Sequence, residues 1–103
     1  MRKEMQDGST PLVLDVFATW CGPCKLLAPQ LDQLAAELGT ACRFAKLDSD
    51  AEPQLSTELR VQGLPTLVFF QGGGAQLAEA HRVEGVPGNA AALRQLVQRH
   101  LGV

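Results

Sequence analysis

Two cysteines separated by two residues lie in the stretch ATWCGPCK, residues 18–25. Cysteines at this spacing have three common chemical uses. They hold a metal ion, they form a static disulfide, or they exchange a disulfide with another molecule. The spacing alone does not choose among these uses, so the choice rests on the rest of the chain.

Few other residues could complete a metal site. The 103-residue chain has three cysteines and two histidines. Three cysteines are one short of a four-cysteine zinc site, and His81 and His100 lack zinc-finger spacing. We therefore expect no metal site. We expect both histidines at the surface, and Cys42 as a small buried strand residue because no second cysteine lies near it in sequence.

Strand and helix patterns alternate around the cysteine motif. The apolar run PLVLDVFA predicts a buried strand, and leucines at helical spacing follow it as far as Gly39. Ser49 or Asp50 is a candidate N-cap for the next helix. The turn GGG (72–74) is too short for a parallel crossover, so it predicts a hairpin. The predicted strands are 11–18, 42–48, 66–71 and 76–83, and the predicted helices are 24–38, 49–60 and 89–101.

This order of elements predicts an α/β domain with a mixed, mostly parallel central sheet and helices on both faces. The length suits one domain covering residues 1–103. The formal net charge is −2 with interspersed signs, so we expect no nucleic-acid partner. No apolar run approaches the ~20 residues that span a bilayer, and no signal-peptide core follows the first residues. We expect a soluble, cytoplasmic protein without a membrane partner.

The predicted elements place the cysteine motif at the start of a helix. Free backbone N–H groups and the positive end of the helix dipole there stabilise a Cys21 thiolate. Cys24 lies one helical turn further on, within reach of a mixed disulfide on Cys21. Gly22 permits a tight turn, and Pro23 fits the first helical turn. This geometry favours thiol–disulfide exchange.

Asp15 is the one charged residue in the first predicted strand. Burial there would raise the pKa of its carboxyl group by desolvation. A carboxylate with a raised pKa could take the proton of Cys24 during attack, through a water molecule if needed. The alternative is an ordinary strand aspartate that faces solvent.

Four short motifs, in order, resemble the landmarks of the thioredoxin family. WCGPCK (20–25) is similar to its active-site signature, and GLPT (63–66) to its cis-proline segment. AKLDSD (45–50) and RVEG (82–85) fall where the family has its central strand and closing glycine. The resemblance runs from about residue 11 to the end of the chain and implies a thioredoxin fold.

The resemblance also implies roles at matching positions. Cys21 would attack and Cys24 would resolve, with Asp15 as the buried family aspartate and Lys46 as the lysine that favours its ionised form. Pro65 would face the disulfide in a cis peptide. The residues expected to border the groove for a partner segment are Trp20, Gly22, Pro23, Gly63, Leu64, Thr66 and Gly85.

The chain departs from the family pattern near its start. Only about ten residues precede the strand at Leu12, where the family has another strand and helix. We therefore expect about four strands, with 42–48 at an edge and residues MRKEMQD as the last turns of the missing helix. We expect a monomer, with a dimer through this shortened side as the alternative. Phe17 stands where the family often has a second tryptophan.

The resemblance implies a protein-disulfide reductase that acts by dithiol–disulfide exchange on disulfide-containing proteins. Its electrons would come from NADPH through a thioredoxin reductase, and the chain itself would bind no cofactor. Three alternatives remain open at this point. The first is a disulfide oxidase or isomerase, and the second is an interaction subunit that docks through its shortened N-terminal face. The third is zinc or iron–sulfur binding by Cys21 and Cys24 across a dimer.

Overall fold

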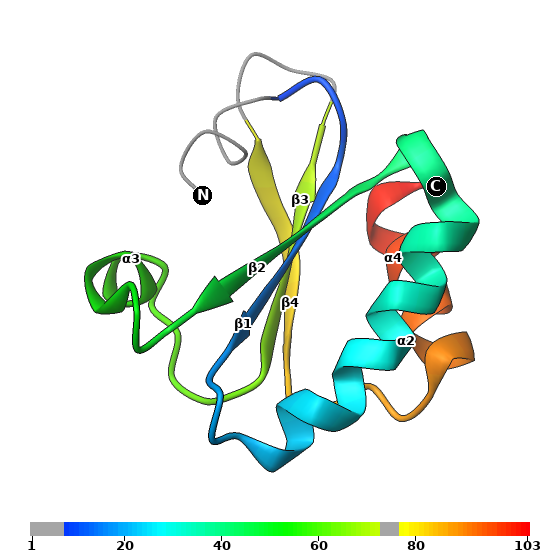
Figure 1. Ribbon diagram of the computed structural model, residues 1–103. Helices are drawn as coiled ribbons and strands as arrows, with labels where there is room; N and C mark the ends of the chain where they lie inside the picture. Colours follow the sequence, from blue (N-terminus) through cyan, green and yellow to red (C-terminus); the bar gives the residue numbers. More distant parts are fainter. Residues whose placement is uncertain (1–7, 73–76) are drawn as a thin grey trace.

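A computed structural model describes residues 8–72 and 77–103 of the chain (Figure 1). The predicted stretch MRKEMQD and most of the GGG turn lie outside these described residues. A single turn of 3-10 helix, Gly39–Ala41, directly follows the helix that ends at Leu38. The strands are β1 (Leu12–Phe17), β2 (Arg43–Asp48), β3 (Thr66–Gln71) and β4 (Ala78–Glu84), and the helices are α2 (Gly22–Leu38), α3 (Pro53–Glu58) and α4 (Ala90–Leu101).

The four described strands form one mixed sheet in the order β2-β1-β3-β4. Strand β1 pairs with β2 in parallel and with β3 antiparallel, and β4 pairs antiparallel with β3. The sheet therefore has one parallel pair and two antiparallel pairs, where we predicted a mostly parallel sheet. The prediction of four strands with 42–48 at an edge is confirmed for the described residues. Helices α2 and α4 lie on one side of the sheet and α3 on the other (Figure 1).

Alternation along β1 divides the interior into two apolar layers. Val13 belongs to the layer beneath α2 and α4, whereas Leu12, Leu14 and Val16 belong to the layer beneath α3. All four side chains are at most 1% exposed, as expected for a strand buried on both faces. Asp15 lies two residues after Val13, so its carboxyl group points toward the α2 side.

Helix α3 is shorter than the predicted helix 49–60, and neither predicted N-cap is correct. The Asp48 carboxylate accepts a hydrogen bond from the Asp50 N–H at 3.0 Å, which makes this segment a turn. The helix begins at Pro53, whose fixed φ suits the first helical position. It ends before Arg60, whose φ of +58° lies in the left-handed region.

Helices α2 and α4 pack against each other as well as on the sheet. The Arg94 guanidinium donates to the Glu37 carboxylate, with a shortest N–O distance of 2.6 Å. Helix α4 is capped by Asn89, whose side chain accepts from the Ala92 N–H at 2.8 Å. Because α2 starts at the cysteine motif, this packing helps to fix the helix that carries the motif.

The histidines differ from the prediction of surface residues. His81 and His100 are half-buried, and their ring centroids lie 3.8 Å apart with the planes at 9°. Both rings also stack with the buried Phe69. Partial burial, with smaller effects from His81 and Arg99, lowers the pKa of His100 below its ordinary value of 6.5.

Candidate active site

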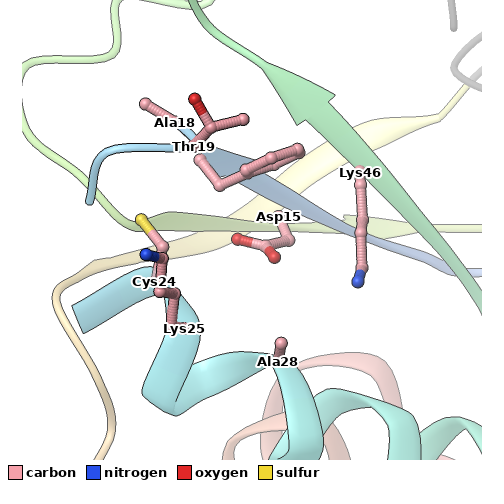
Figure 2. A pocket seen from close by; sticks show the side chains of 8 residues that line it. Asp15, Ala18, Thr19, Cys24, Lys25, Ala28 and Lys46 are labelled. Atoms are coloured by element: carbon pink, nitrogen blue, oxygen red, sulfur yellow. The ribbon is translucent and has the colours of Figure 1, made fainter. Parts of the chain in front are cut away.

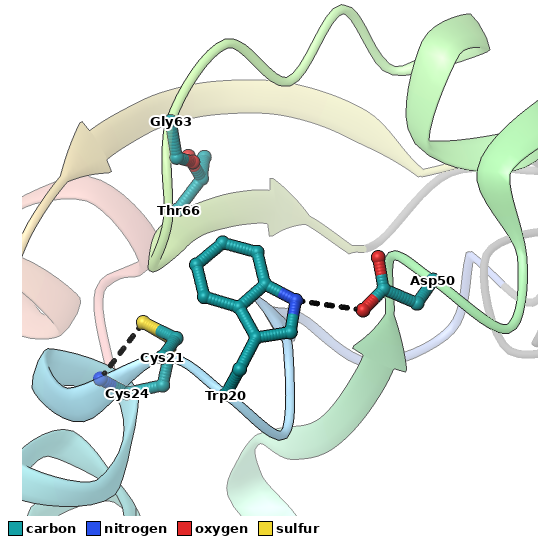
Figure 3. The surroundings of a disulfide bond; sticks show 6 residues. All are labelled: Trp20, Cys21, Cys24, Asp50, Gly63 and Thr66. Atoms are coloured by element: carbon teal, nitrogen blue, oxygen red, sulfur yellow. Dashed lines mark hydrogen bonds between the residues drawn. A yellow bond between two sulfur atoms is a disulfide. The ribbon is translucent and has the colours of Figure 1, made fainter.

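Cys21 and Cys24 are joined in a disulfide at the N-terminus of α2, with their Cα atoms 5.3 Å apart. Figure 3 shows the surroundings of this disulfide. Cys21 is the N-cap residue of the helix. Its sulfur accepts a hydrogen bond from the Cys24 N–H at 3.2 Å. The Cys21 N–H donates in turn to the Ala18 carbonyl at 3.1 Å, which closes the turn after β1. The predicted location of the thiols at a helix start is confirmed, and this location stabilises a thiolate at Cys21.

Asp15 lies behind the disulfide, in the middle of the sheet, and is only 3% exposed. Desolvation by burial raises the pKa of Asp15 from 3.8 to about 6, and the charge of Lys46 partly opposes this rise. Its Oδ1 atom has no hydrogen-bond partner among the described residues. Both predicted effects on this carboxyl group, from burial and from Lys46, are therefore present.

A cavity of about 300 Å³ connects Asp15 with the second cysteine. Figure 2 shows the Asp15 carboxylate between Cys24 and Lys46, which stands opposite Asp15 in the register of β1 and β2. A cavity of this size has room for several water molecules, and the unpartnered Oδ1 gives them an acceptor. The residues lining it are Asp15, Phe17, Ala18, Thr19, Cys24, Lys25, Ala28 and Lys46.

The segment before β3 forms the wall beside the disulfide. The Leu64–Pro65 peptide bond is cis, as predicted. The Thr66 hydroxyl donates to the Gly63 carbonyl at 2.6 Å, and the Pro65 carbonyl accepts from the Gly85 N–H at 2.7 Å. The Leu64 side chain packs against the cluster of Ala18 and the two cysteines. These hydrogen bonds and this packing fix the position of the predicted cis-proline segment next to the thiols.

Trp20 is 69% exposed and lies next to Cys21 (Figure 3). Its indole N–H donates to the Asp50 carboxylate at 2.8 Å. Sequence reasoning missed this role of Asp50, because the two residues are 30 positions apart and no local pattern joins them. The indole also borders a surface cavity of about 490 Å³, lined by Trp20, Ser49, Ser56, Val61, Gln62, Gly63 and Leu64.

The structure brings most of the predicted site residues together around the disulfide. Gly22 and Pro23 are exposed at the turn between the cysteines. Gly85 takes a φ of +87°, a left-handed conformation that favours glycine, and reaches the site through its bond to Pro65. Cys42 lies apart from the site in the layer beneath α2 and α4. Within residues 8–72 and 77–103, no three potential metal-ligating side chains gather into a group.

This arrangement consists of a disulfide at a helix start, a buried carboxyl group behind it, and a cis-proline wall beside it. It can pass two electrons to or from another disulfide through a mixed disulfide. Fold and site together define a thiol–disulfide oxidoreductase. Within the described residues, no helix has both the length and the apolar character needed to cross a membrane.

Comparison with known proteins gives the family. The thioredoxin family model matches residues 1–99. A thioredoxin-like protein of Synechocystis is 42% identical over 90% of this chain and 86% of its own length. The thioredoxin of Mycobacterium bovis is 39% identical over 90% of this chain and 77% of its own length. The chain therefore belongs to the thioredoxin family, and it is a protein-disulfide oxidoreductase that acts through its cysteine pair.

Solved structures agree with this assignment. The crystal structure of chloroplastic thioredoxin z superimposes with a TM-score of 0.76 at 42% identity, covering 88% of this chain and 78% of that one. Oxidised mitochondrial thioredoxin 3 of Saccharomyces cerevisiae also gives a TM-score of 0.76, at 34% identity, covering 95% and 85% of the two chains.

One relative carries a second activity in its name. The bifunctional thioredoxin reductase/thioredoxin of Mycobacterium leprae is 40% identical over 90% of this chain. The chain spans only 19% of the length of that relative. The match therefore covers a small part of a larger protein.

Proposed function

We propose that this protein is a general protein-disulfide reductase that receives its electrons from a thioredoxin reductase. The observation that carries the proposal is the Cys21–Cys24 disulfide at the start of α2, with Asp15 behind it across a shared cavity. One chain supplies every residue of this site, so we take the monomer as the active unit.

The first chemical step starts from the reduced dithiol. The Cys21 thiolate attacks one sulfur of the partner disulfide and forms a mixed disulfide. The other partner sulfur leaves as a thiolate and takes a proton from water. Trp20 and the segment Gly63–Thr66 border Cys21, so an extended partner segment lies along them while its sulfur approaches. Gly22 and Pro23 are exposed beside Cys21, so the partner segment contacts this turn as its sulfur approaches.

The second step resolves the mixed disulfide. Asp15 accepts the proton of Cys24 through water in the cavity that both residues line. The Cys24 thiolate attacks the Cys21 sulfur, the Cys21–Cys24 disulfide forms, and the second partner thiolate leaves. The partner gains two electrons and this chain loses two. Lys46 favours the ionised form of Asp15 and so keeps the carboxylate ready to accept the proton.

The reduced dithiol is then restored from outside the chain. We assign this step to a thioredoxin reductase that uses NADPH, with no cofactor held by this chain. The relative in Mycobacterium leprae joins a thioredoxin reductase and a thioredoxin in its name, which supports a direct partnership of the two. We also propose that the protein works in the cytoplasm, since a reductase suits a compartment whose thiols are kept reduced.

The test follows insulin-disulfide reduction with NADPH and a bacterial thioredoxin reductase. The wild-type protein is expected to support NADPH oxidation that depends on insulin. Cys24→Ser is expected to stop turnover and to accumulate a mixed disulfide with insulin, seen as a mass increase on the intact protein. Cys21→Ser is the matched control and should form no such adduct.

The outcome of this experiment also decides whether the protein passes electrons to its substrates or takes electrons from them. Failure of the wild type to speed insulin reduction with either dithiothreitol or the reductase would overturn the proposal. If the protein instead oxidises reduced substrates faster than it reduces oxidised ones, at the same glutathione ratio, it is an oxidase or isomerase.

A further inference from the structure

Two large apolar side chains are strongly exposed within the described parts of the chain. Trp20 is 69% exposed and Leu26 is 67% exposed. Trp20 immediately precedes Cys21, and Leu26 lies two positions after Cys24. A single exposed leucine needs no explanation, but both residues flank the same disulfide.

Leu26 does not belong to the core-facing stripe of α2. Its neighbour Leu27 is fully buried, and Leu31 and Leu34 continue that stripe at helical spacing. Leu26 lies four positions after Gly22 and three before Pro29, and both of these residues are exposed. These positions share one face of the helix, so Leu26 stands one turn away from the exposed tip of the cysteine motif.

A protein that exchanges its disulfide here must touch this turn. Its sulfur has to reach Cys21, whose exposed neighbours on α2 are Gly22 and Pro23. Leu26 follows Gly22 by four residues on the same helix face, so it lies next to that contact area. It lies on α2, whereas Trp20 extends toward the β2–α3 turn through its hydrogen bond to Asp50. The two apolar side chains therefore extend the contact area in two separate directions from the disulfide.

We propose that Leu26 is an apolar contact residue for the disulfide-bearing partner protein, adding an α2 surface to the groove beside Trp20. The fitting partner carries an apolar side chain near its own disulfide, which packs on Leu26 while the sulfurs exchange. Apolar contact of this kind is the usual centre of a protein interface, and polar rims surround it. The exposed Lys25 beside Leu26 provides part of such a rim. The inference rests on the proposed reductase function.

Leu26→Ser tests this contact, with Ala36→Ser as the matched control. Ala36 is exposed on the same helix, ten positions further from the disulfide. Steady-state rates are measured with insulin and with the small substrate bis(2-hydroxyethyl) disulfide. Leu26→Ser is expected to raise KM for insulin about fivefold, the size of losing one apolar interface contact. Its kinetics with the small disulfide should equal those of wild type, and Leu26→Met should restore insulin binding.

Several results would overturn the proposal. One is an unchanged KM for insulin in Leu26→Ser, and another is an equal loss with insulin and with the small disulfide. A third is a sedimentation change from dimer to monomer caused by Leu26→Ser, because Leu26 would then serve a contact between copies of this chain. Failure of the proposed function has a different signature, since the wild type would then reduce neither substrate.

Discussion

The cysteine pair and Cys42 are similar in burial and opposite in chemistry. Cys21, Cys24 and Cys42 are 4%, 5% and 3% exposed. The pair sits at the start of α2 with a cavity behind it, whereas Cys42 sits just before β2 in the apolar layer beneath α2 and α4. Burial alone therefore does not decide whether a thiol in this domain is reactive.

The surroundings of the sulfur make the difference. Desolvation raises the pKa of the Cys42 thiol to about 11, even though the Arg43 charge opposes this rise. The Cys42 S–H donates weakly to the Arg43 carbonyl at 3.5 Å, and no second thiol is paired with it. Cys21 instead caps a helix, and the Cys24 N–H donates a hydrogen bond to its sulfur at 3.2 Å. A helix N-terminus and a second thiol one turn away distinguish the reactive site from the inert one.

The largest expected effect is the difference in insulin reduction between a variant that lacks Cys21 and a variant that lacks Cys42. Cys21→Ser is expected to lower insulin reduction to the rate of dithiothreitol alone, because the attacking sulfur is gone. Cys42→Ser is expected to keep the rate within about twofold, since Cys42 touches no part of the exchange path. The measurement is the turbidity assay for reduced insulin.

Alkylation of the reduced wild-type protein provides the control for this contrast. At pH 7.5 a thiol with a pKa near 11 is ionised in about one molecule in three thousand. Iodoacetamide should therefore modify Cys21 long before Cys42. Equal labelling of both thiols in the folded protein would refute the contrast between them.

A smaller effect is expected from the carboxyl group behind the pair. Asp15→Asn removes the proton acceptor for Cys24, so resolution of the mixed disulfide should slow about tenfold at pH 7. In wild type the rate of this resolution step should fall as the pH falls through about 6, because protonated Asp15 cannot accept the proton of Cys24. In Asp15→Asn the resolution rate should no longer fall below about pH 6, as measured by rapid-quench trapping of the mixed disulfide. If the rate still fell there, a group other than Asp15 would be responsible for the pH dependence.

The same substitution should stabilise the fold. Asp15 has a pKa of about 6 in the folded protein and an ordinary value of 3.8, so between these values the folded state holds more protons than the unfolded state. Stability therefore falls as the pH rises through this range, by about 3 kcal/mol in total at pH 7. Asp15→Asn should recover much of that energy at pH 7 and little at pH 4, as measured by urea unfolding.

The smallest effect concerns Lys46. Lys46→Gln removes the positive charge that lowers the pKa of Asp15, so this pKa should rise above about 6. The fall in the resolution rate should then begin at a higher pH. The rate should be about threefold lower at pH 6.5 and unchanged at pH 8.5. Lys46→Arg keeps the charge and should behave as wild type. An identical profile for Gln and Arg variants would show that the charge of Lys46 has no part in this tuning.

The sequence predicted the features that depend on local patterns. Short apolar runs and the helical spacing of leucines located the strands and the long helices, and the resemblance of GLPT (63–66) to the family's cis-proline segment indicated the cis peptide. Contacts between distant segments were not predictable in this way. The Trp20–Asp50 hydrogen bond and the stacking of His81 on His100 depend on how separate elements meet in space. The late start of α3 was missed because Ser49 and Asp50 suit a turn as well as a helix cap.

The position of Asp15 on the central strand makes the register of β1 a condition for activity. Asp15 stands opposite Lys46 on one neighbouring strand and Leu67 on the other. A slip of one residue would turn its carboxyl group into the apolar layer beneath α3, away from Cys24, and would turn leucine side chains toward the cavity. A misregistered chain would thus bury a carboxyl group in hydrocarbon and lose its proton acceptor at the same time. The catalytic rate of a refolded sample therefore also measures the fraction of chains in which β1 has paired in the correct register.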